Sequence, residues 1–185
     1  MSSSTHPNCQ KLIQRVADFL SEIENLTPGR DLEERLNHEY GPGNDFYDDF
    51  ARIIRAGLEN DEGWVATDEV QGANYRRTRI SSPTEATRFC SITTVYMNPS
   101  TRNEEVLRGQ YHLHPYGEIN CVIPMAEDAQ LKGMNGWQGA GWTSPGPGTH
   151  HYPEARGGPV VALFFLPAGR ISYSVTPDVP QPSSV

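Results

Sequence analysis

The chain has 185 residues, 36% of them hydrophobic, and a formal net charge of −8, which suits one compact domain with its own core. The acidic balance and the lack of a Lys/Arg cluster argue against a nucleic-acid partner or an anionic membrane surface. No apolar run approaches the roughly 20 residues of a membrane helix, and Met1 to Asn8 has neither the basic nor the apolar part of a signal peptide. Cys9, Cys90 and Cys121 lie far apart and are odd in number, which favours reduced thiols and a cytoplasmic protein.

The first third of the chain has the periodicity of amphipathic helices, with apolar residues gathered on one stripe of each. Thr27-Pro28-Gly29 and Gly41-Pro42-Gly43 are breakers between these segments. The predicted helices are Asn8–Leu26, Leu32–Tyr40 and a third one capped by Asn44 or Asp45 and continuing to Leu58. We therefore expect a helical segment over residues 1–62, packed on the rest of the chain.

After Gly63 the helical period stops and short runs rich in β-branched and aromatic residues follow, separated by turn residues. The predicted strands are Tyr75–Ile80, Phe89–Met97, Gly109–His114, Ile119–Pro124 and Val160–Leu166. Their spacing of roughly ten residues is typical of a β-sandwich or barrel, which we expect over residues 63–175. Residues 176–185 carry three prolines and two serines and predict a loose or wrapping tail.

Four of the six histidines lie between Gln110 and Tyr152. His112 and His114 are two apart in a β-type run, so both side chains point to the same face of one strand. Glu118 follows a Pro-Tyr-Gly turn that can bring its carboxylate back toward the imidazoles. A glycine-rich turn about thirty residues later delivers His150 and His151. Two or three His and one carboxylate, with a position left open, are typical of a catalytic divalent metal site, and they do not distinguish Fe, Mn or Zn.

These residues resemble the two motifs of the cupin family. Gly109-x-x-His112-x-His114-x-x-x-Glu118 resembles the first motif, in which both His and the Glu are metal ligands. Gly148-x-x-His151 has the spacing of the second, so His151 is the preferred fourth ligand. The proline of that motif falls on Gly146, which leaves His150 as an alternative. Because adjacent strand residues face opposite sides, only one of the two should enter the pocket.

A narrower resemblance covers nearly the whole chain. The block from His112 to Pro124 and the segment from Gly141 to His151 are similar to the small bacterial 4-hydroxylaminobenzoate lyases of nitrobenzoate degradation. The resemblance implies a mostly β fold, a cupin-like β-barrel (double-stranded β-helix) behind an N-terminal helical segment. It also implies conversion of 4-hydroxylaminobenzoate to 3,4-dihydroxybenzoate and ammonia by a metalloenzyme, and a homodimer is the expected assembly.

That reaction suggests roles for further residues. Glu118, as ligand or proton shuttle, and His150 are the catalytic candidates. A benzoate needs a cation, and Arg77 and Arg79 share one face of their strand, although both could simply be exposed charges. The candidates for the rest of the substrate site are Tyr111, Asn120 and Trp142, with Trp137 and Phe164 as other possible aromatic walls.

Two other functions remain open at this point. The same ligands could serve a cupin dioxygenase or isomerase acting on another small acid. Alternatively, the histidines could hold a metal only for stability in a ligand-binding cupin, because the fold by itself does not decide the chemistry.

Overall fold

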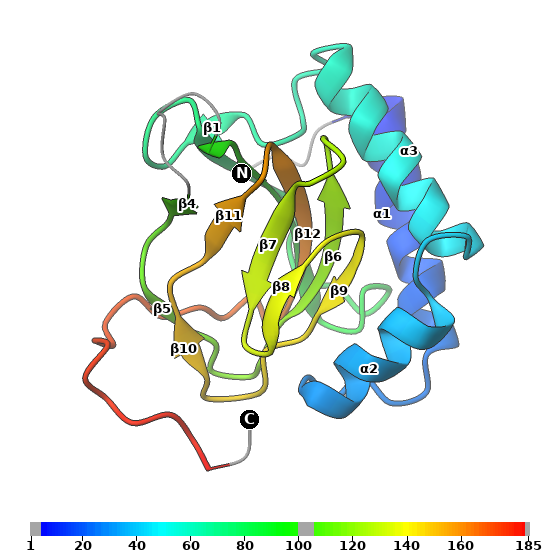
Figure 1. The fold of residues 1–185 in the computed structure, drawn as a ribbon. Coiled ribbons are helices and arrows are strands. Elements are labelled where there is room, and N and C mark those ends of the chain that lie inside the picture. The colour runs from blue at the N-terminus through cyan, green and yellow to red at the C-terminus, as the bar shows by residue number, and fades with distance from the viewer. Residues whose placement is uncertain (1–4, 100–105, 184–185) are drawn as a thin grey trace.

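The computed structural model describes residues 5–99 and 106–183. The described chain begins with helices α1 (Pro7–Glu22), α2 (Arg30–Glu39) and α3 (Asp45–Glu59) and continues in β-strands (Figure 1). The predicted N-terminal helices are therefore confirmed. The cap of α3 is Asn44, whose side chain accepts a hydrogen bond of 2.9 Å from the backbone nitrogen of Phe46.

The described strands form antiparallel sheets of six, four and two strands. The six-stranded sheet has the spatial order β1 (Asp68–Glu69), β2 (Tyr75–Ser81), β3 (Cys90–Met97), β12 (Val160–Pro167), β6 (Ile119–Pro124) and β9 (Gly141–Thr143). The four-stranded sheet has the order β4 (Val106–Arg108), β11 (Glu154–Arg156), β7 (Gln130–Gly133) and β8 (Gly136–Gln138). The remaining pair consists of β5 (His112–Leu113) and β10 (His150–His151).

The mostly β class predicted from the sequence is confirmed, with antiparallel sheets behind N-terminal helices. Among the described residues the sheets stay separate in their hydrogen bonding, so the barrel is not closed into one continuous ladder. The short strands β1, β4, β7, β8, β9 and β11 were not predicted.

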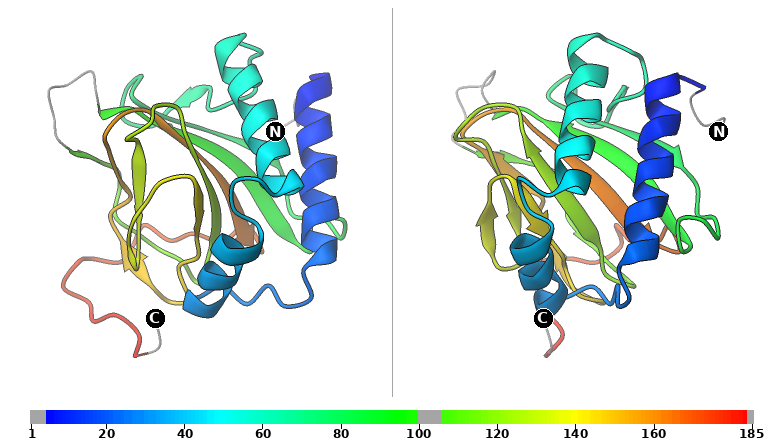
Figure 2. Two further views of the ribbon diagram at one scale, coloured as in Figure 1. Left: turned by 45° about the vertical axis from the view of Figure 1, so that its right-hand side comes forward. Right: turned by 90° about the vertical axis from the view of Figure 1, so that its right-hand side faces the viewer.

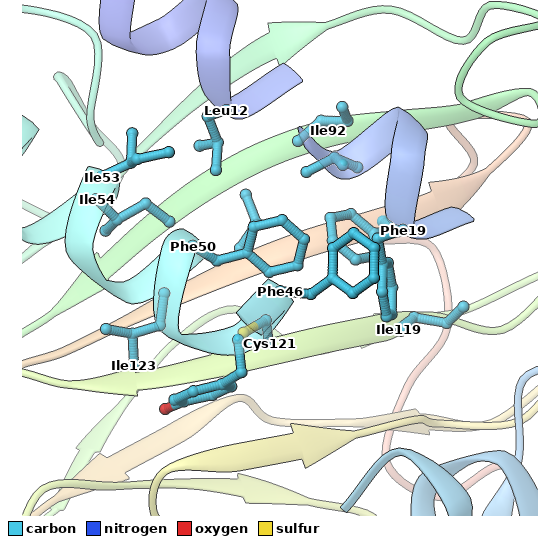
Figure 3. Packing of buried hydrophobic residues seen from close by; sticks show 14 of the residues in the cluster. Leu12, Phe19, Phe46, Phe50, Ile53, Ile54, Ile92, Ile119, Cys121 and Ile123 are labelled. Carbon is cyan, nitrogen blue, oxygen red and sulfur yellow. The ribbon is translucent and has the colours of Figure 1, made fainter. Parts of the chain in front are cut away.

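Helices α1 and α3 cover one face of the six-stranded sheet (Figure 2). Figure 3 shows the core between them, in which Phe19, Phe46 and Phe50 from the helices meet Ile119 and Cys121 of β6. A second group of buried apolar residues fills the space between the six-stranded and the four-stranded sheets. Its members include Tyr75, Val95, Val122, Leu131, Ala155 and Ala162. Because both faces of the large sheet are covered, its central strands are buried along almost their whole length.

The C-terminal segment runs past β5 and β10 (Figure 1). The backbones of Leu113 and Ser172 exchange hydrogen bonds of 2.7 and 3.0 Å, and the Gln181 side chain exchanges two with the backbone of His150, at 3.1 and 2.6 Å. Described residues up to Gln181 are thus tied to the histidine-bearing strands. Of the helices in the described ranges, none has the length and apolar character needed to cross a membrane.

Candidate active site

The pairing of β5 with β10 brings distant histidines together. His151 lies directly opposite His112 in the antiparallel register, and His150 lies opposite Leu113. Directly opposite residues of an antiparallel pair share a face. The register therefore sends His151 to the side of His112 and His150 to the other side, whereas the glycine spacing in the sequence only favoured His151 and left His150 as an alternative.

His114 completes a cluster with these two residues. The ring centroids of the three imidazoles lie 4.7 to 5.0 Å apart. One ligand nitrogen of each lies within 4.8 Å of the others, the spacing of ligands around one ion. His112 and His114 are 3% and 0% exposed, whereas His151 is only partly buried, so the cluster is shielded from solvent except on the side of His151.

Backbone carbonyls fix the orientation of two of these rings. Nδ1 of His112 lies 3.0 Å from the carbonyl oxygen of Gln110, and Nδ1 of His114 lies 2.9 Å from that of Thr149. A carbonyl only accepts, so each Nδ1 carries the hydrogen and each Nε2 presents a lone pair. The two Nε2 atoms are 3.0 Å apart. Two lone pairs at this distance repel each other unless a cation lies beside them.

Burial also keeps the imidazoles neutral. It lowers the pKa of His112 to about 4, an effect that the bond to Gln110 opposes and the charge of Arg77 reinforces. Burial and the neighbouring His112 lower the pKa of His151 to about 3, and burial holds the pKa of His114 well below its usual range. Neutral imidazoles are the form that ligates metals, so the cluster is ready to bind one at neutral pH.

Glu118 returns to the cluster through the turn at Gly117, as expected from the sequence. Gly117 has φ +80°, and a side chain there would collide with Pro28 at 2.4 Å, so glycine is required. Oε1 of Glu118 lies 3.9 Å from Nε2 of His114. Glu118 is 1% exposed, and burial raises its pKa to about 7 although a hydrogen bond from Asn120 opposes the rise. Within the described residues its Oε2 is buried without a hydrogen-bond partner.

Asn120 lies beside Glu118 on the same face of β6. Its Nδ2 donates to Oε1 of Glu118 at 2.7 Å and to Oγ1 of Thr143 at 3.0 Å. Phe164 of β12 is its neighbour across the sheet and is only partly buried. This arrangement agrees with the predicted position of Asn120 on the inner face.

Arg77 lies close to the cluster and brings a residue that sequence reasoning missed. Its Nη1 donates to the hydroxyl of Tyr173 at 2.7 Å, and the Tyr173 ring is 6.1 Å from that of His112. Tyr75 was also missed; it is buried, and burial first and then the charges of Tyr173 and Glu118 raise its pKa to about 12. Nothing in the sequence pattern links Tyr173 to a strand almost a hundred residues earlier.

The structure places Arg79 elsewhere. It shares the face of Arg77, as predicted, but its Nη2 donates to the carbonyl of Gly169 at 3.3 Å. Among the described residues Arg79 makes no hydrogen bond to the histidine cluster.

Trp142, which we predicted to line the substrate site, lies in the hydrophobic core. Trp142 lies opposite Cys121 on the helix-covered face of the sheet and is fully buried. Its ring stacks on Phe19 with centroids 5.0 Å apart, and its Nε1 donates to the carbonyl of Tyr40 at 2.8 Å. The neighbouring residue, Thr143, is the one that faces Asn120. Trp142 is therefore a residue of the hydrophobic core.

His150 and Tyr111 also lie outside the cluster, in contrast to their predicted roles as catalytic and substrate-binding residues. Tyr111 precedes His112 and His150 precedes His151, so both point to the opposite face of the strand pair. There the Tyr111 hydroxyl bonds Nδ1 of His150, whose Nε2 lies 3.3 Å from the carbonyl oxygen of Pro180. The pair holds the C-terminal segment in place.

The residues present fit a divalent metal. His112, His114 and His151 could ligate it through nitrogen, and the unpartnered Oε2 of Glu118 is a nearby anionic oxygen. Neutral imidazoles with a carboxylate are a set that first-row transition metals bind.

Comparison with known proteins identifies the family. The model of the PnbB 4-hydroxylaminobenzoate lyase family matches residues 14–173. A 4-hydroxylaminobenzoate lyase from Nocardioides sp. (strain LMS-CY) is 52% identical over 168 residues, which cover 91% of this chain and 96% of the relative. A second one, from Pseudomonas putida, is 46% identical over 167 residues, 88% of this chain and 94% of the relative.

Solved structures show a more distant likeness. An RmlC-like cupin protein from Ralstonia eutropha matches at 12% identity with a TM-score of 0.45, covering 65% of this chain and 71% of its own. A DMSP lyase from Ruegeria pomeroyi matches at 16% identity with a TM-score of 0.42, covering 92% of this chain and 98% of its own. The family model and the two close relatives span nearly the whole sequence, and the chain belongs to the 4-hydroxylaminobenzoate lyase family.

Proposed function

We propose that this protein converts 4-hydroxylaminobenzoate and water to 3,4-dihydroxybenzoate and ammonia, with a divalent first-row transition metal held by His112, His114 and His151. The observation that carries the proposal is the 52% identity to a 4-hydroxylaminobenzoate lyase over 91% of the chain. The clustered imidazoles beside a buried carboxyl group support it independently. When bound, the metal supplies Lewis-acid chemistry, which weakens a bond to oxygen and makes water more acidic.

The reaction needs a group that gives a proton and takes it back. The N–O bond of the hydroxylamine breaks as its oxygen leaves with a proton as water, and the ring becomes electron-poor. A water molecule then adds to the ring carbon next to the nitrogen-bearing carbon and releases a proton. A second water hydrolyses the resulting imine to a ketone and ammonia, and loss of the ring proton with enolisation gives the catechol. One water is consumed overall, and no oxidant is needed.

Glu118 is the residue suited to that proton exchange. In the metal-free protein burial raises its pKa to about 7, which lies in the range that suits an acid–base catalyst. Oε1 is engaged by Asn120, so Oε2 is the atom left to donate and accept the proton. We therefore assign Glu118 to proton transfer rather than to the metal.

Arg77 is suited to hold the substrate carboxylate. A guanidinium can bind a carboxylate through two parallel hydrogen bonds. Arg77 lies close enough to the cluster for its charge to lower the pKa of His112, and Tyr173 fixes one of its nitrogens. Phe164, partly buried between Thr93 and Asn120 on the same sheet face, is the best-placed wall for the aromatic ring.

We propose further that the enzyme works in the cytoplasm as a homodimer, without a nucleic-acid or membrane partner. Cys90 and Cys121 are buried free thiols, as suits a reducing compartment. The net charge of −8 disfavours polyanionic partners. The dimer rests on the cupin resemblance, and sedimentation of the purified protein tests it.

One assay tests the reaction. Purified metal-replete protein, incubated anaerobically with 4-hydroxylaminobenzoate, should release one ammonia for each 3,4-dihydroxybenzoate formed. Untouched substrate would refute the proposed function. A requirement for oxygen would instead indicate a dioxygenase.

A second measurement tests the metal ligands. His112→Ala and His114→Ala should each sharply lower the bound metal found by elemental analysis, because each removes one ligand of the cluster. His150→Ala is the matched control and should keep its metal, since that ring lies on the other face of β10. Equal occupancy in all variants would refute the ligand assignment.

A further inference from the structure

The side chain of Asn120 has an unusual pattern of hydrogen bonds for a buried amide. The residue is 3% exposed. Its Nδ2 donates one bond to Oε1 of Glu118 at 2.7 Å and the other to Oγ1 of Thr143 at 3.0 Å. An amide nitrogen has two hydrogens, so both donors of Asn120 are in use.

These two contacts fix which way the amide faces. Exchanging the oxygen and nitrogen atoms would bring the carbonyl oxygen of Asn120 against the carboxyl oxygen of Glu118, which carries no hydrogen when Glu118 is ionised. The observed orientation, in which Nδ2 donates to Oε1, is therefore the one that suits an ionised Glu118. Oδ1 must point away from both partners, and it is buried without a donor among residues 5–99 and 106–183.

A buried carbonyl oxygen without a donor is uncommon, because its water is lost and nothing replaces it. Oε2 of Glu118, in the adjacent acceptor group, is also unpartnered in the described part of the chain. Two neighbouring groups thus present acceptors beside the histidine cluster, and a bound molecule that carries a hydrogen-bond donor can satisfy the amide oxygen. Glu118 can meet a metal or carry its own proton, whereas the amide oxygen of Asn120 can never become a donor.

The hydroxylamino group matches this requirement. Its nitrogen carries one hydrogen and its oxygen another, so it offers two donors. The nitro and nitroso groups in the same ring position offer only acceptor atoms. They would place an oxygen or a lone pair against Oδ1 of Asn120. A site with a buried acceptor for a hydrogen-bond donor of the substrate discriminates strongly against analogues that lack this donor. When such an analogue binds, the buried polar group of the site is left unpaired.

We propose that Asn120 is a specificity-determining residue, whose fixed amide oxygen accepts a hydrogen bond from the N–H or N–OH of the substrate and excludes the more oxidised nitro and nitroso analogues. The inference rests on the proposed function, since it names the contact that this site makes with the reacting nitrogen. Glu118 and Thr143 are positioning residues for the amide.

A pair of benzoates of equal shape tests the contact. 4-Aminobenzoate carries an NH2 group where 4-methylbenzoate carries a methyl group of similar size, and only the former is a donor. Calorimetry on the metal-replete protein should give an affinity for 4-aminobenzoate that is higher by about tenfold or more, the usual worth of a buried hydrogen bond. 4-Nitrobenzoate should bind more weakly than 4-aminobenzoate.

Asn120→Leu, a substitution of similar shape, should bring the ratio of the two affinities close to one. Thr93→Val is the matched control: Thr93 is buried on the same sheet face, opposite Phe164, and within the described part of the chain it makes no hydrogen bond to Glu118 or Asn120. It should keep the wild-type ratio. A merely structural role of Asn120 would lower the melting temperature and weaken both ligands alike, and that result would overturn the proposal.

The wild-type protein alone can also overturn it. Equal affinities for 4-aminobenzoate and 4-methylbenzoate, in a protein that still releases ammonia from 4-hydroxylaminobenzoate, would refute the role of Asn120 and leave the proposed function standing. A metal-replete protein that releases no ammonia would refute the proposed function, and the inference with it.

Discussion

Replacing Arg77 with methionine should weaken substrate binding without slowing the chemical step. Methionine keeps the length of the side chain and removes the guanidinium. Arg77 is exposed, and Tyr173 holds its Nη1 at 2.7 Å beside the ring of His112. The carboxylate of 4-hydroxylaminobenzoate does not change during the reaction, so a contact with it stabilises the bound substrate and the transition state equally. Loss of such a contact raises KM and leaves kcat nearly unchanged.

The size of the effect follows from the exposure of the guanidinium. Hydrogen bonds to charged groups contribute about 1.5–3 kcal/mol, whereas fully exposed ion pairs contribute roughly 0–1 kcal/mol. Arg77 is solvent-exposed but anchored by Tyr173, so a loss of about 1–2 kcal/mol is expected. That corresponds to a rise in KM of about 5- to 30-fold.

Steady-state ammonia release at varied substrate concentration measures this change. Arg79→Met is the matched control, because Arg79 occupies the same strand face but bonds Gly169, and its KM should change less than about twofold. Phenylhydroxylamine, which lacks the carboxylate, should be turned over with the same kcat/KM by wild type and Arg77→Met. The reasoning fails if both arginine variants raise KM equally, or if Arg77→Met is as harmful for phenylhydroxylamine.

Three further outcomes are expected. Glu118→Gln should lower kcat by about a hundredfold or more, the usual share of acid–base catalysis, with metal content unchanged by elemental analysis; loss of the metal would make Glu118 a ligand instead. Trp142→Phe should lower the free energy of unfolding in urea by about 2–3 kcal/mol and leave KM unchanged, because it creates a cavity and leaves the Tyr40 carbonyl without a donor. A raised KM at unchanged stability would indicate that Trp142 lines the substrate site. Metal-free protein should lose stability as the pH falls from 6.5 to 4.5. In the folded protein His112 and His151, whose pKa values are about 4 and about 3, stay neutral, whereas both become protonated in the unfolded chain. Each histidine therefore lowers the free energy of unfolding by about 1.4 kcal/mol for each pH unit that the pH falls. Glu118, with a pKa of about 7, raises the free energy of unfolding as the pH falls over this range, and so offsets the contribution of one imidazole. A free energy of unfolding in urea that does not change with pH would contradict the assignment of neutral buried imidazoles.

The sequence predicted the elements with strong periodicity and missed the short ones. The helical stripe and the runs Ile119–Pro124 and Val160–Leu166 correspond to observed elements. Strands β8 and β9 are three residues each and begin with glycine, so they carry too little alternation to be recognised. Their position depends on pairing with distant strands.

The sequence predicted those parts of the site that depend on residue spacing along one strand. It could not predict the parts that depend on how distant strands pair. His112, His114 and Glu118 follow from alternation along one strand and a glycine turn. Alternation also shows that Trp142 and Thr143 face opposite sides, but not which side is the interior. Both faces of the large sheet are buried, one by helices and one by the second sheet, so hydrophobicity gives no answer. The pairing of His151 with His112 likewise exists only once β5 meets β10.

The polarity of the finished site explains why these particular side chains belong together. Around the histidine cluster, the atoms that find no donor among residues 5–99 and 106–183 are acceptors: the Nε2 lone pairs of His112 and His114, Oε2 of Glu118 and Oδ1 of Asn120. Arg77 contributes the positive charge near them. A metal satisfies the nitrogens, a carboxylate matches the guanidinium, and the remaining amide acceptor needs a donor. 4-Hydroxylaminobenzoate has both a carboxylate and a donor at opposite ends of its ring, whereas the nitro compound has acceptors at both ends. The unsatisfied atoms of the fold thus favour the hydroxylamine over its oxidised counterpart on the grounds of hydrogen bonding alone.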